Sequence, residues 1–359
     1  MKNEISIGLI GIGSIAESSH IPNLKTAAGV KLAAVADMDF DRARDVSQTH
    51  GIPLFFKTAE EMFGKTQLDA VMICTPNATH IPIAMKAAEK GIHVFMEKPI
   101  GTDVEEVENY LRFTKEKNVM TMVGMPHRFR REAQILKKHA SKGTFGNVYY
   151  VKARLFRRRG TPKGWFTDKA LSGGGALMDI GVHVLDLAWW LIGRPEARSI
   201  TGQTITGLGN YETNYVSSWE SSNKQLNSGR IFDVDDFGAA WIRFANGAVL
   251  SLETSWALNG EQDEGIKIDI FGDKGGGSLM PLSIFTEEDG LLGKTQPVFE
   301  RNDPFKDEIE HFIECIRTGA APLIDGEDGY EVLKLLTGIY ESSRLEKEIQ
   351  YNEGREDTC

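Results

Sequence analysis

A glycine-rich turn at residues 11–16 (GIGSIA) constrains the fold more than any other feature of the sequence. It joins an apolar run, residues 5–10, to a stretch with helical character. Gly11 permits a tight strand-to-helix turn, and Gly13 lets a pyrophosphate approach the backbone with no side chain between them. Ala16 keeps the helix close to the strand, and the helix N-terminus attracts an anion. A purely structural bend is the alternative, but a turn between strand and helix is the context that a dinucleotide site requires.

Up to about residue 125, short apolar runs alternate with helical stretches. The expected strands are residues 5–10, 31–36, 54–56, 69–75, 93–98 and 119–125, and the expected helices are residues 14–28, 39–50, 58–63, 80–90 and 103–117. Repeated strand–helix–strand units with nearly continuous apolar strands predict a parallel sheet covered on both faces. We therefore predict a doubly wound α/β (Rossmann) domain over residues 1–125, with its ligand beyond the carboxyl ends of the strands.

The pattern changes after residue 125. Strands are expected at residues 148–156, 198–206, 237–244, 248–256 and 266–271, and helices at residues 130–142, 176–191, 304–318 and 327–347. Asn246-Gly247 is a strong hairpin signal, and strands joined by hairpins form an antiparallel sheet. Residues 126–359 are predicted to form an α+β domain with a large, mainly antiparallel open sheet, for substrate binding and oligomerisation. Residues 207–230 are expected to be a loop or insertion and residues 354–359 a loose tail.

Composition argues against several classes of protein. The net charge of −10 makes a nucleic-acid partner unexpected, because binding phosphates needs clustered Lys and Arg. No apolar run approaches the ~20 residues of a membrane-spanning helix. The three cysteines, Cys74, Cys315 and Cys359, show neither a disulfide pattern nor metal-ligand spacing. We therefore expect a cytoplasmic protein without a metal.

An acidic residue indicates which dinucleotide binds. Asp37 ends the second expected strand, roughly 20 residues beyond the turn, where a carboxylate accepts hydrogen bonds from the adenosine ribose. A carboxylate there would repel the 2′-phosphate of NADP, so NAD is favoured and NADP stays open. Arg42 complicates the choice because it could lie over the adenine or meet a phosphate. The alternative role for Asp37 is the N-cap of the next helix.

Two polar segments end buried strands at the predicted crevice: residues 74–80 (CTPNATH) and residues 95–99 (FMEKP). Asn77 and Thr79 either contact a ligand or cap the following helix. Lys98 lies where an ammonium beside a nicotinamide would polarise a substrate oxygen. The alternative for Lys98 is an ordinary surface lysine.

A third segment, residues 173–183 (GGGALMDIGVH), contains a carboxylate and an imidazole. Asp179 and His183 are four residues apart and share one face of a helix. Such an aspartate can orient the histidine ring and hold its charge while the ring accepts a proton. A surface ion pair and a metal site are the alternatives. The glycine run would let another backbone, or a cofactor, approach the helix start closely.

Taken together, these segments resemble the glucose–fructose oxidoreductase/inositol dehydrogenase (Gfo/Idh/MocA) family. The blocks GIGSIA, TPNATH, MEKP and GGGALMDIGVHVLDLAWWLIG occur in the family's order, and residues 322–329 (PLIDGEDG) resemble a segment common near its end. The resemblance implies that Lys98 and Asp179 contact the substrate and that His183 is the acid/base. The positions expected to line the dinucleotide, from the resemblance and the residues together, are Gly11, Gly13, Ser14, Ile15, Asp37, Arg42, Thr75, Pro76, Asn77, His80, Glu97 and Lys98.

The chain departs from the family at one place. Many members have Gly-Phe-Asn before an Arg-Phe pair, whereas residues 124–129 here are GMPHRF. An asparagine contact near the nicotinamide would be absent, and His127 becomes a candidate substrate residue. Arg157 and Trp165 are further candidates. Strand alternation cannot point the three arginines of residues 157–159 into one pocket, which favours solvated side chains or a subunit contact for several of them.

The predicted activity is NAD(P)-dependent hydride transfer to or from a secondary alcohol of a sugar, inositol or related polyol. The alternatives are an NAD-dependent glycoside hydrolase and a non-catalytic dinucleotide-binding sensor with the same fold. Retention of Lys98, Asp179 and His183 together argues against the sensor. An open sheet face suits assembly, so a homodimer or homotetramer is expected.

Overall fold

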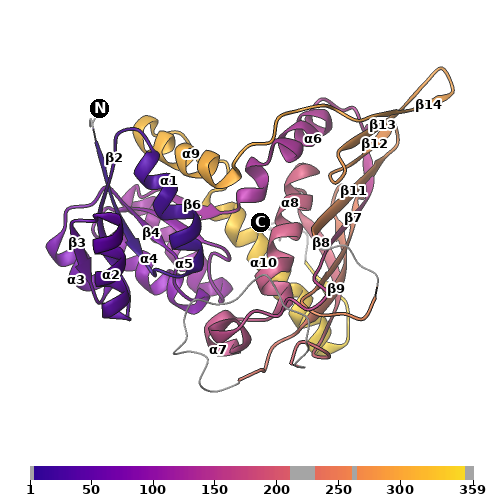
Figure 1. Cartoon of the computed structure of the whole chain (residues 1–359). Helices are drawn as coiled ribbons and strands as arrows, with labels where there is room; N and C mark the ends of the chain where they lie inside the picture. The colour runs from indigo at the N-terminus through magenta and orange to yellow at the C-terminus, as the bar shows by residue number, and fades with distance from the viewer. Residues whose placement is uncertain (1–3, 211–230, 261–264, 352–359) are drawn as a thin grey trace, which may run out of the picture.

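The computed structural model describes residues 4–210, 231–260 and 265–351. Two sheets organise them, a six-stranded parallel sheet and a nine-stranded, mainly antiparallel sheet (Figure 1). The predicted combination of a Rossmann domain with an α+β domain is therefore confirmed. Most of the expected insertion at residues 207–230, and the whole expected tail at residues 354–359, lie outside the described residues.

The first sheet has the strand order of a doubly wound domain. In space its parallel strands run β3 (Leu54–Phe56), β2 (Val30–Ala36), β1 (Ile5–Ile10), β4 (Ala70–Ile73), β5 (His93–Glu97) and β6 (Thr121–Gly124). β4 is buried along its whole length, because helices cover both faces of the sheet. The strand order reverses between β1 and β4, so the ligand crevice opens at their carboxyl ends.

The helical segments of this half begin either with or without a side-chain cap. They are the π-helical turn η1 (Ala16–His20), α1 (Ile21–Thr26), α2 (Phe40–His50), α3 (Ala59–Lys65), the 3-10 turn η2 (Asn77–Thr79), α4 (His80–Glu89) and α5 (Val104–Lys117). Asp39, Thr58 and Asp103 each accept a hydrogen bond from the backbone N–H three residues ahead. The N-cap of α2 is thus Asp39, and the alternative that Asp37 caps this helix is wrong.

The second sheet contains every described strand after residue 125. In space the strands run β14 (Leu291–Thr295), β13 (Ser283–Glu288), β12 (Gly275–Ser278), β11 (Gly265–Gly272), β7 (Val148–Phe156), β10 (Val249–Ser255), β9 (Phe237–Phe244), β8 (Ala197–Ile205) and β15 (Ile349–Gln350). β7 and β10 pair in parallel, and the other pairings of the described strands are antiparallel. The predicted hairpin between β9 and β10 is confirmed, with Gly247 at a φ of 86°.

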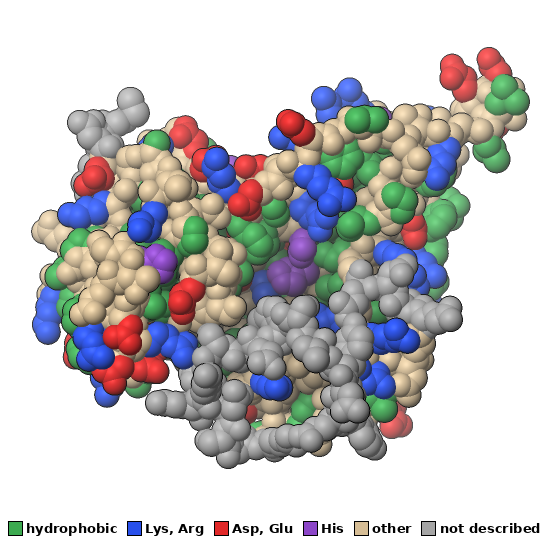
Figure 2. Space-filling view, viewed as in Figure 1, with side chains coloured by type: hydrophobic (Ala, Val, Ile, Leu, Met, Phe, Trp, Pro, Cys, Tyr) green, Lys and Arg blue, Asp and Glu red, His purple; other side chains and the backbone are tan. Residues whose placement is uncertain are grey.

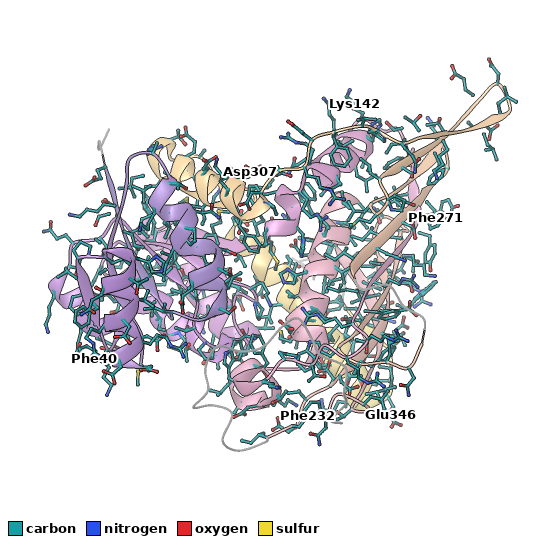
Figure 3. All side chains as sticks on the ribbon, viewed as in Figure 1. Phe40, Lys142, Phe232, Phe271, Asp307 and Glu346 are labelled. Carbon is teal, nitrogen blue, oxygen red and sulfur yellow. The ribbon has the colours of Figure 1, made fainter. Side chains whose placement is uncertain are left out.

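Helices cover one face of this sheet. The helical segments of this half are η3 (Pro126–Phe129), α6 (Arg131–Ser141), η4 (Gly164–Thr167), α7 (Lys169–Ser172), η5 (Leu177–Gly181), α8 (Val182–Leu191), α9 (Pro304–Thr318) and α10 (Gly326–Leu345). α6, α8 and α10 lie along the inner face, and a hollow separates this half from the first (Figures 1 and 2). Phe271 projects from the outer face (Figure 3).

The end of the chain returns to the first sheet. Phe312 on α9 meets Phe95 edge-on, with ring centroids 5.5 Å apart. The backbone N–H of Val123 on β6 donates to the Ile324 carbonyl at 3.1 Å, just before α10 begins. α9 and the start of α10 therefore cover the first sheet, although they follow the second sheet in the sequence.

A buried ion-pair network joins the elements around the hollow. Arg128 in η3 is fully buried and donates to both carboxylate oxygens of Asp186 on α8, at 2.9 and 2.6 Å. Its remaining terminal nitrogen donates to Asp328 on α10 at 2.7 Å, and Arg194 pairs with the same carboxylate. The segment at residues 322–329 thus supplies a partner for a buried guanidinium.

Replacing Arg128 should unfold the protein at a lower urea concentration. Arg128→Ala leaves the buried Asp186 carboxylate without its ion-pair partner and Asp328 with Arg194 alone, which costs about 3–5 kcal/mol of unfolding free energy. Urea titration followed by tryptophan fluorescence measures the change. The matched control is Lys115→Ala, which removes an exposed ion pair to Glu327, also between a first-half helix and α10; its midpoint should hardly move. Equal midpoints for the two variants would contradict this account of the network.

Candidate functional site

The glycine turn has the geometry of a phosphate site. Gly11 has a φ of 82°, and a Cβ placed on it would lie 2.7 Å from the Cys74 carbonyl carbon, closer than real Cβ atoms approach. Ala16 is fully buried at the start of η1, as expected for a helix held close to the sheet. Ser14 is exposed beside it. The turn therefore presents backbone to the crevice, with no side chain on Gly11 to fill the approach.

The Asp37 carboxylate lies directly against this turn. One carboxylate oxygen accepts a hydrogen bond from the Ile12 N–H at 2.7 Å, and the other accepts from the Asp39 N–H at 2.8 Å. Arg42 donates to the Ile12 carbonyl at 3.2 Å. Each carboxylate oxygen keeps a further lone pair for a ribose hydroxyl. The residues present therefore fit a dinucleotide laid over the turn with its adenosine ribose at Asp37.

Hydrogen bonds fix the loops after β4 and β5 to each other. His80 is fully buried, with Nδ1 2.8 Å from the Pro99 carbonyl and Nε2 2.8 Å from the Thr75 carbonyl. The Thr79 hydroxyl donates to the Pro76 carbonyl at 2.7 Å. The first helical turns η2 and α4 begin without a side-chain cap, so the capping alternative for Thr79 is wrong. His80 acts from inside the protein, where it orders the two loops.

Asn77 connects the two halves of the protein. Its side-chain amide is buried and donates to the Ser172 carbonyl on α7 at 2.8 Å. The capping alternative is therefore wrong for Asn77 as well, because this amide bonds to the second half. Thr102, in the loop after β5, contacts the same region: a Cβ on Gly173 would lie 2.6 Å from its methyl carbon. The start of the segment with Asp179 and His183 is thus docked onto the crevice loops.

Lys98 reaches across the hollow to Asp179. Its Nζ donates to one Asp179 carboxylate oxygen and to the Asp179 backbone carbonyl, both at 2.9 Å. Trp256 Nε1 donates to the other carboxylate oxygen at 3.0 Å, and Arg157 lies 3.9 Å from it. Burial opposes the charged form, but the two cations outweigh it and lower the pKa of Asp179. Asp179 therefore accepts hydrogen bonds from Lys98 and Trp256 and lies within ion-pair distance of Arg157.

Two neutral histidines lie beside this cluster. The rings of His127 and His183 meet edge-on with centroids 4.9 Å apart, and the Nδ1 atom of each is buried without a hydrogen-bond partner among the described residues. Burial, then the nearby positive charge of Lys98, holds the pKa of His183 well below its ordinary value. Burial lowers the pKa of His127 to about 3. Figure 2 shows histidine side chains in the hollow.

The partner of Asp179 differs from the prediction. The sequence suggested that Asp179 orients His183 and holds its charge, but the Asp179 carboxylate pairs with Lys98, Trp256 and Arg157 instead. η5 begins with a π-helical turn, which changes the faces that residues four apart present. His183 is consequently a neutral imidazole, while Asp179 carries the charge.

The glycine run is explained by a backbone rather than by a cofactor. A Cβ on Gly175 would overlap the carbonyl oxygen of Asp235, and one on Gly174 would overlap the Tyr340 hydroxyl. The Asp235 carboxylate accepts hydrogen bonds from the N–H groups of Gly175 and Leu177, at 2.7 and 2.9 Å. Tyr340 donates to the same carboxylate at 2.7 Å. Asp235 therefore caps, from another segment, the helical turn that contains Asp179.

Sequence reasoning missed Asp235, Tyr340 and Trp256. Trp256 directly follows β10 and is fully buried. In the sequence it is one more apolar residue at a strand end, and Asp235 is one of several acidic residues near residue 235. Neither position has a local pattern that separates it from core or loop. The glycine run was the available signal. It indicated that another group approaches the helix start closely, but it did not identify that group.

The arginine run sends one side chain to the site. Arg157 reaches Asp179, whereas Arg158 is exposed and Arg159 donates to the Leu258 carbonyl at 2.7 Å. Alternation along an extended strand end accounts for the opposite direction of Arg158, and the bond to Leu258 holds Arg159 away from Asp179. Trp165 stacks on Phe166 at 3.9 Å between ring centroids. Its role toward a substrate stays a prediction.

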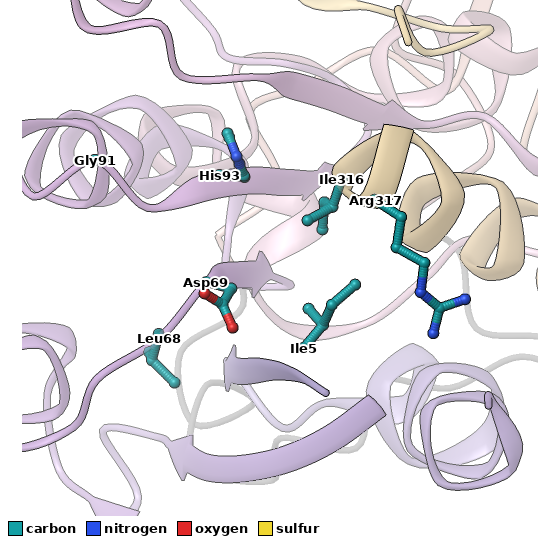
Figure 4. Close-up of a pocket in the computed structure, with 7 residues that line it drawn as sticks. All are labelled: Ile5, Leu68, Asp69, Gly91, His93, Ile316 and Arg317. Carbon is teal, nitrogen blue, oxygen red and sulfur yellow. The ribbon is translucent and has the colours of Figure 1, made fainter. Parts of the chain in front are cut away.

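A separate cavity lies at the other end of the first sheet, beside the amino ends of its central strands (Figure 4). It has a volume of about 270 Å³ and is lined by Ile5, Leu68, Asp69, Gly91, His93, Ile316 and Arg317. Asp69 already accepts a hydrogen bond from the Ser6 N–H, and His93 Nδ1 accepts one from Met120. Its position at the amino ends of the strands separates it from Lys98.

Among the described residues, no three His, Cys, Asp or Glu side chains could hold a metal together, and no helix could cross a membrane.

Comparisons with known proteins agree with this architecture. Residues 5–125 match the family model described as "Oxidoreductase family, NAD-binding Rossmann fold", and residues 133–277 match the "GFO/IDH/MocA C-terminal domain". The D-glucoside 3-dehydrogenase of Escherichia coli is 28% identical over 97% of this chain and 98% of that protein. The myo-inositol 2-dehydrogenase of Thermotoga maritima is 28% identical over 95% of this chain and 96% of that protein.

A solved structure supports the fold independently. Levoglucosan dehydrogenase in complex with NADH matches with a TM-score of 0.84 at 23% identity, over 98% of this chain and 100% of that one. At this identity the match shows the fold alone. The description of the matching N-terminal family model confirms the predicted cofactor, NAD.

A methyl group at Gly175 should disturb the site. Gly175→Ala forces apart the helix start and the Asp235 backbone, so we expect unfolding at lower temperature by several degrees and loss of the Asp179 geometry. Thermal unfolding followed by circular dichroism measures the change. Gly64→Ala is the control, because Gly64 lies in α3 with open space around it and alanine favours a helix. If Gly175→Ala were as stable as Gly64→Ala, the close packing inferred here would be wrong.

Proposed function

Because the chain belongs to the Gfo/Idh/MocA family of oxidoreductases, we propose that it oxidises a secondary alcohol of a sugar, inositol or related polyol with NAD. The observation that carries the proposal is the meeting of Lys98, Asp179 and neutral His183 from the two sides of the hollow. A glucoside dehydrogenase and an inositol dehydrogenase among the relatives support the same substrate class.

The dinucleotide is placed by the turn and the two crevice loops. In the proposed complex the glycine turn would hold the pyrophosphate, Asp37 would hold the adenosine ribose, and the nicotinamide would lie near Lys98. The proposed lining positions are Gly11, Gly13, Ser14, Ile15, Asp37, Arg42, Thr75, Pro76, Asn77, His80, Glu97 and Lys98. The side chains of Asn77, His80 and Glu97 bond inside the protein, so these positions contribute shape and backbone. The Asp37 carboxylate favours NAD over NADP by charge repulsion.

Bound NAD supplies the hydride acceptor. The neutral ring of His183 accepts the proton of the reacting hydroxyl. Two of the three N–H groups of the Lys98 ammonium go to Asp179, and the third is left for the substrate oxygen. Lys98 thereby stabilises negative charge as it develops on that oxygen. Asp179, held by Trp256, keeps Lys98 in place and accepts a hydrogen bond from a neighbouring substrate hydroxyl.

His127 and Arg157 shape the substrate end of the site. The His127 ring packs against His183, and its Nδ1 is buried without a hydrogen-bond partner among the described residues. His127 lies in the segment where many family members have an asparagine that this chain lacks. Arg157 lies beside Asp179 and meets a hydroxyl next to the reacting one. Trp165 adds an aromatic surface for the face of a sugar ring.

Assembly of copies is proposed through the outer face of the second sheet. Tyr150 lies within 5.8 Å of Trp241 and 5.6 Å of Phe271 between ring centroids, and the latter two side chains are each 40% exposed. No described helix covers this aromatic cluster, and two copies packed face to face would bury it. The expected product is a homodimer or homotetramer.

Cys74 and Cys315 are free thiols, which supports a cytoplasmic location.

A panel of inositols, aldoses, glucosides and sugar acids, each with NAD and NADP, tests the function. We expect reduced cofactor to accumulate with at least one polyol or sugar, and faster with NAD.

Lys98→Ala should lower kcat by about 10²-fold or more while NAD affinity changes little, because the lost hydrogen bond strengthens in the transition state. Isothermal titration of NAD measures that affinity.

The same panel separates the alternatives. Release of a chromogenic aglycone without accumulation of reduced cofactor would identify a glycoside hydrolase. Sugar binding with no turnover of either kind would identify a sensor. Full activity of Lys98→Ala on the accepted substrate would remove Lys98 from the mechanism.

The pH dependence of alcohol oxidation tests His183. Its lowered pKa means that the ring stays neutral as the pH falls through about 6.5, the ordinary histidine value, and becomes protonated only at lower pH. We expect kcat/KM for oxidation to stay level from pH 8 down through 6.5 and to fall only at a pH well below 6.5. A pH–rate profile at constant ionic strength measures this. A half-loss of kcat/KM at pH 7 or above would exclude His183, in its buried neutral state, as the base.

A further inference from the structure

A buried carboxylate directly precedes Lys98 and has a partner that the mechanism does not use. Glu97 ends β5, and only 8% of the residue is exposed. One carboxylate oxygen lies 2.7 Å from His20 Nε2, and the other accepts a hydrogen bond from the Lys98 backbone N–H at 3.3 Å. His20 is completely buried. Glu97 therefore connects an imidazole from a different element with the backbone of the catalytic lysine.

His20 comes from the helix that follows the glycine turn. It is the last residue of η1, whose buried residues are Ala16 and His20. Its ring lies edge-on to Phe95 of β5, with centroids 5.6 Å apart, and to Phe305 of α9 at 6.4 Å. These rings restrict the imidazole, so its Nε2 stays directed at Glu97. A π-helical turn is uncommon and is often found at functional sites.

The surroundings make Glu97 the charged member of a buried group. Burial opposes ionisation, yet the hydrogen bond from His20 and the nearby positive charge, including that of Lys98, together outweigh it and lower the pKa of Glu97. Burial and the charge of Glu97 raise the pKa of nearby Glu308 well above its ordinary value. Gly124 on β6 leaves room for the Glu97 carboxylate, because a Cβ there would come within 3.3 Å of it. A buried ionised carboxylate costs several kcal/mol unless its position is closely matched by donors.

We propose that His20 and Glu97 act as a positioning pair for Lys98, in which His20 orients the Glu97 carboxylate and Glu97 holds the Lys98 backbone N–H. The pair fixes the base of the lysine side chain, while Asp179 fixes its ammonium end. Lys98 is thus held at both ends, from the glycine-turn helix on one side and from η5 on the other. The proposal rests on the proposed role of Lys98 in alcohol oxidation.

A double-mutant cycle tests whether His20 acts through Lys98. His20→Phe keeps an aromatic ring between Phe95 and Phe305 and removes the donor to Glu97. We expect kcat to fall about 10-fold, as a small misplacement of a catalytic group does, with KM for the alcohol and NAD affinity within about 2-fold. His20→Gln retains an N–H donor and should recover most of the loss. Ser18→Ala, at an exposed position of the same turn, is the control and should leave kcat unchanged.

The decisive comparison uses the Lys98→Ala background, with single-turnover reduction of NAD so that slow rates remain measurable. If His20 acts through Lys98, adding His20→Phe there should change the rate less than about 2-fold. A further 10-fold loss, or no recovery with His20→Gln at equal thermal stability, would overturn the pair. Full activity of Lys98→Ala alone would instead refute the proposed function, so the two failures are distinguishable.

Discussion

The buried contact of Arg128 with Asp186 and Asp328 is the constraint on which the arrangement of the site depends. Arg128 follows β6 of the first sheet within a few residues, Asp186 lies on the helix that continues from η5, and Asp328 lies on α10. A guanidinium without water must have its donors matched by acceptors. The network therefore fixes the angle between the two halves near the hollow. His127, next to Arg128, and His183, three residues before Asp186, are positioned by the same contact.

Different environments give neighbouring groups different charges. Asp179 is buried but surrounded by Lys98, Arg157 and Trp256, so it is ionised. For His183, burial first and the nearby positive charge second disfavour the protonated ring, so it is neutral. The site thus places a neutral imidazole beside an ionised carboxylate that is bound to Lys98. Burial alone would favour the neutral form of both side chains. The cations beside Asp179 keep its carboxylate ionised.

Local sequence predicted what local physics controls. The glycine turn, the apolar runs and the Asn246-Gly247 hairpin are short-range patterns, and such patterns located Lys98 at the end of β5 and Asp179 and His183 on the helical segment formed by η5 and α8. β12 was missed because Gly275–277 has no side chains to alternate, and the β13–β14 hairpin was missed although Asp289-Gly290 is the same type of turn signal. The partner of Asp179 could not be read from spacing, because Trp256 is 77 residues away. Likewise, nothing local shows that Asp235 is the backbone that approaches Gly175.

The return of α9 and Ile324 to the first sheet has a consequence for how the chain folds during synthesis. Phe95 finds Phe312, and β6 finds the Ile324 carbonyl, only after more than 300 residues have been made. The part that the ribosome produces first is therefore completed last. Until then its newly formed sheet has an apolar face and an unpaired strand edge, which are the features that chaperones bind and that aggregation exploits. α9 and the start of α10 complete the packing of the first sheet, and an amino-terminal fragment would lack this cover.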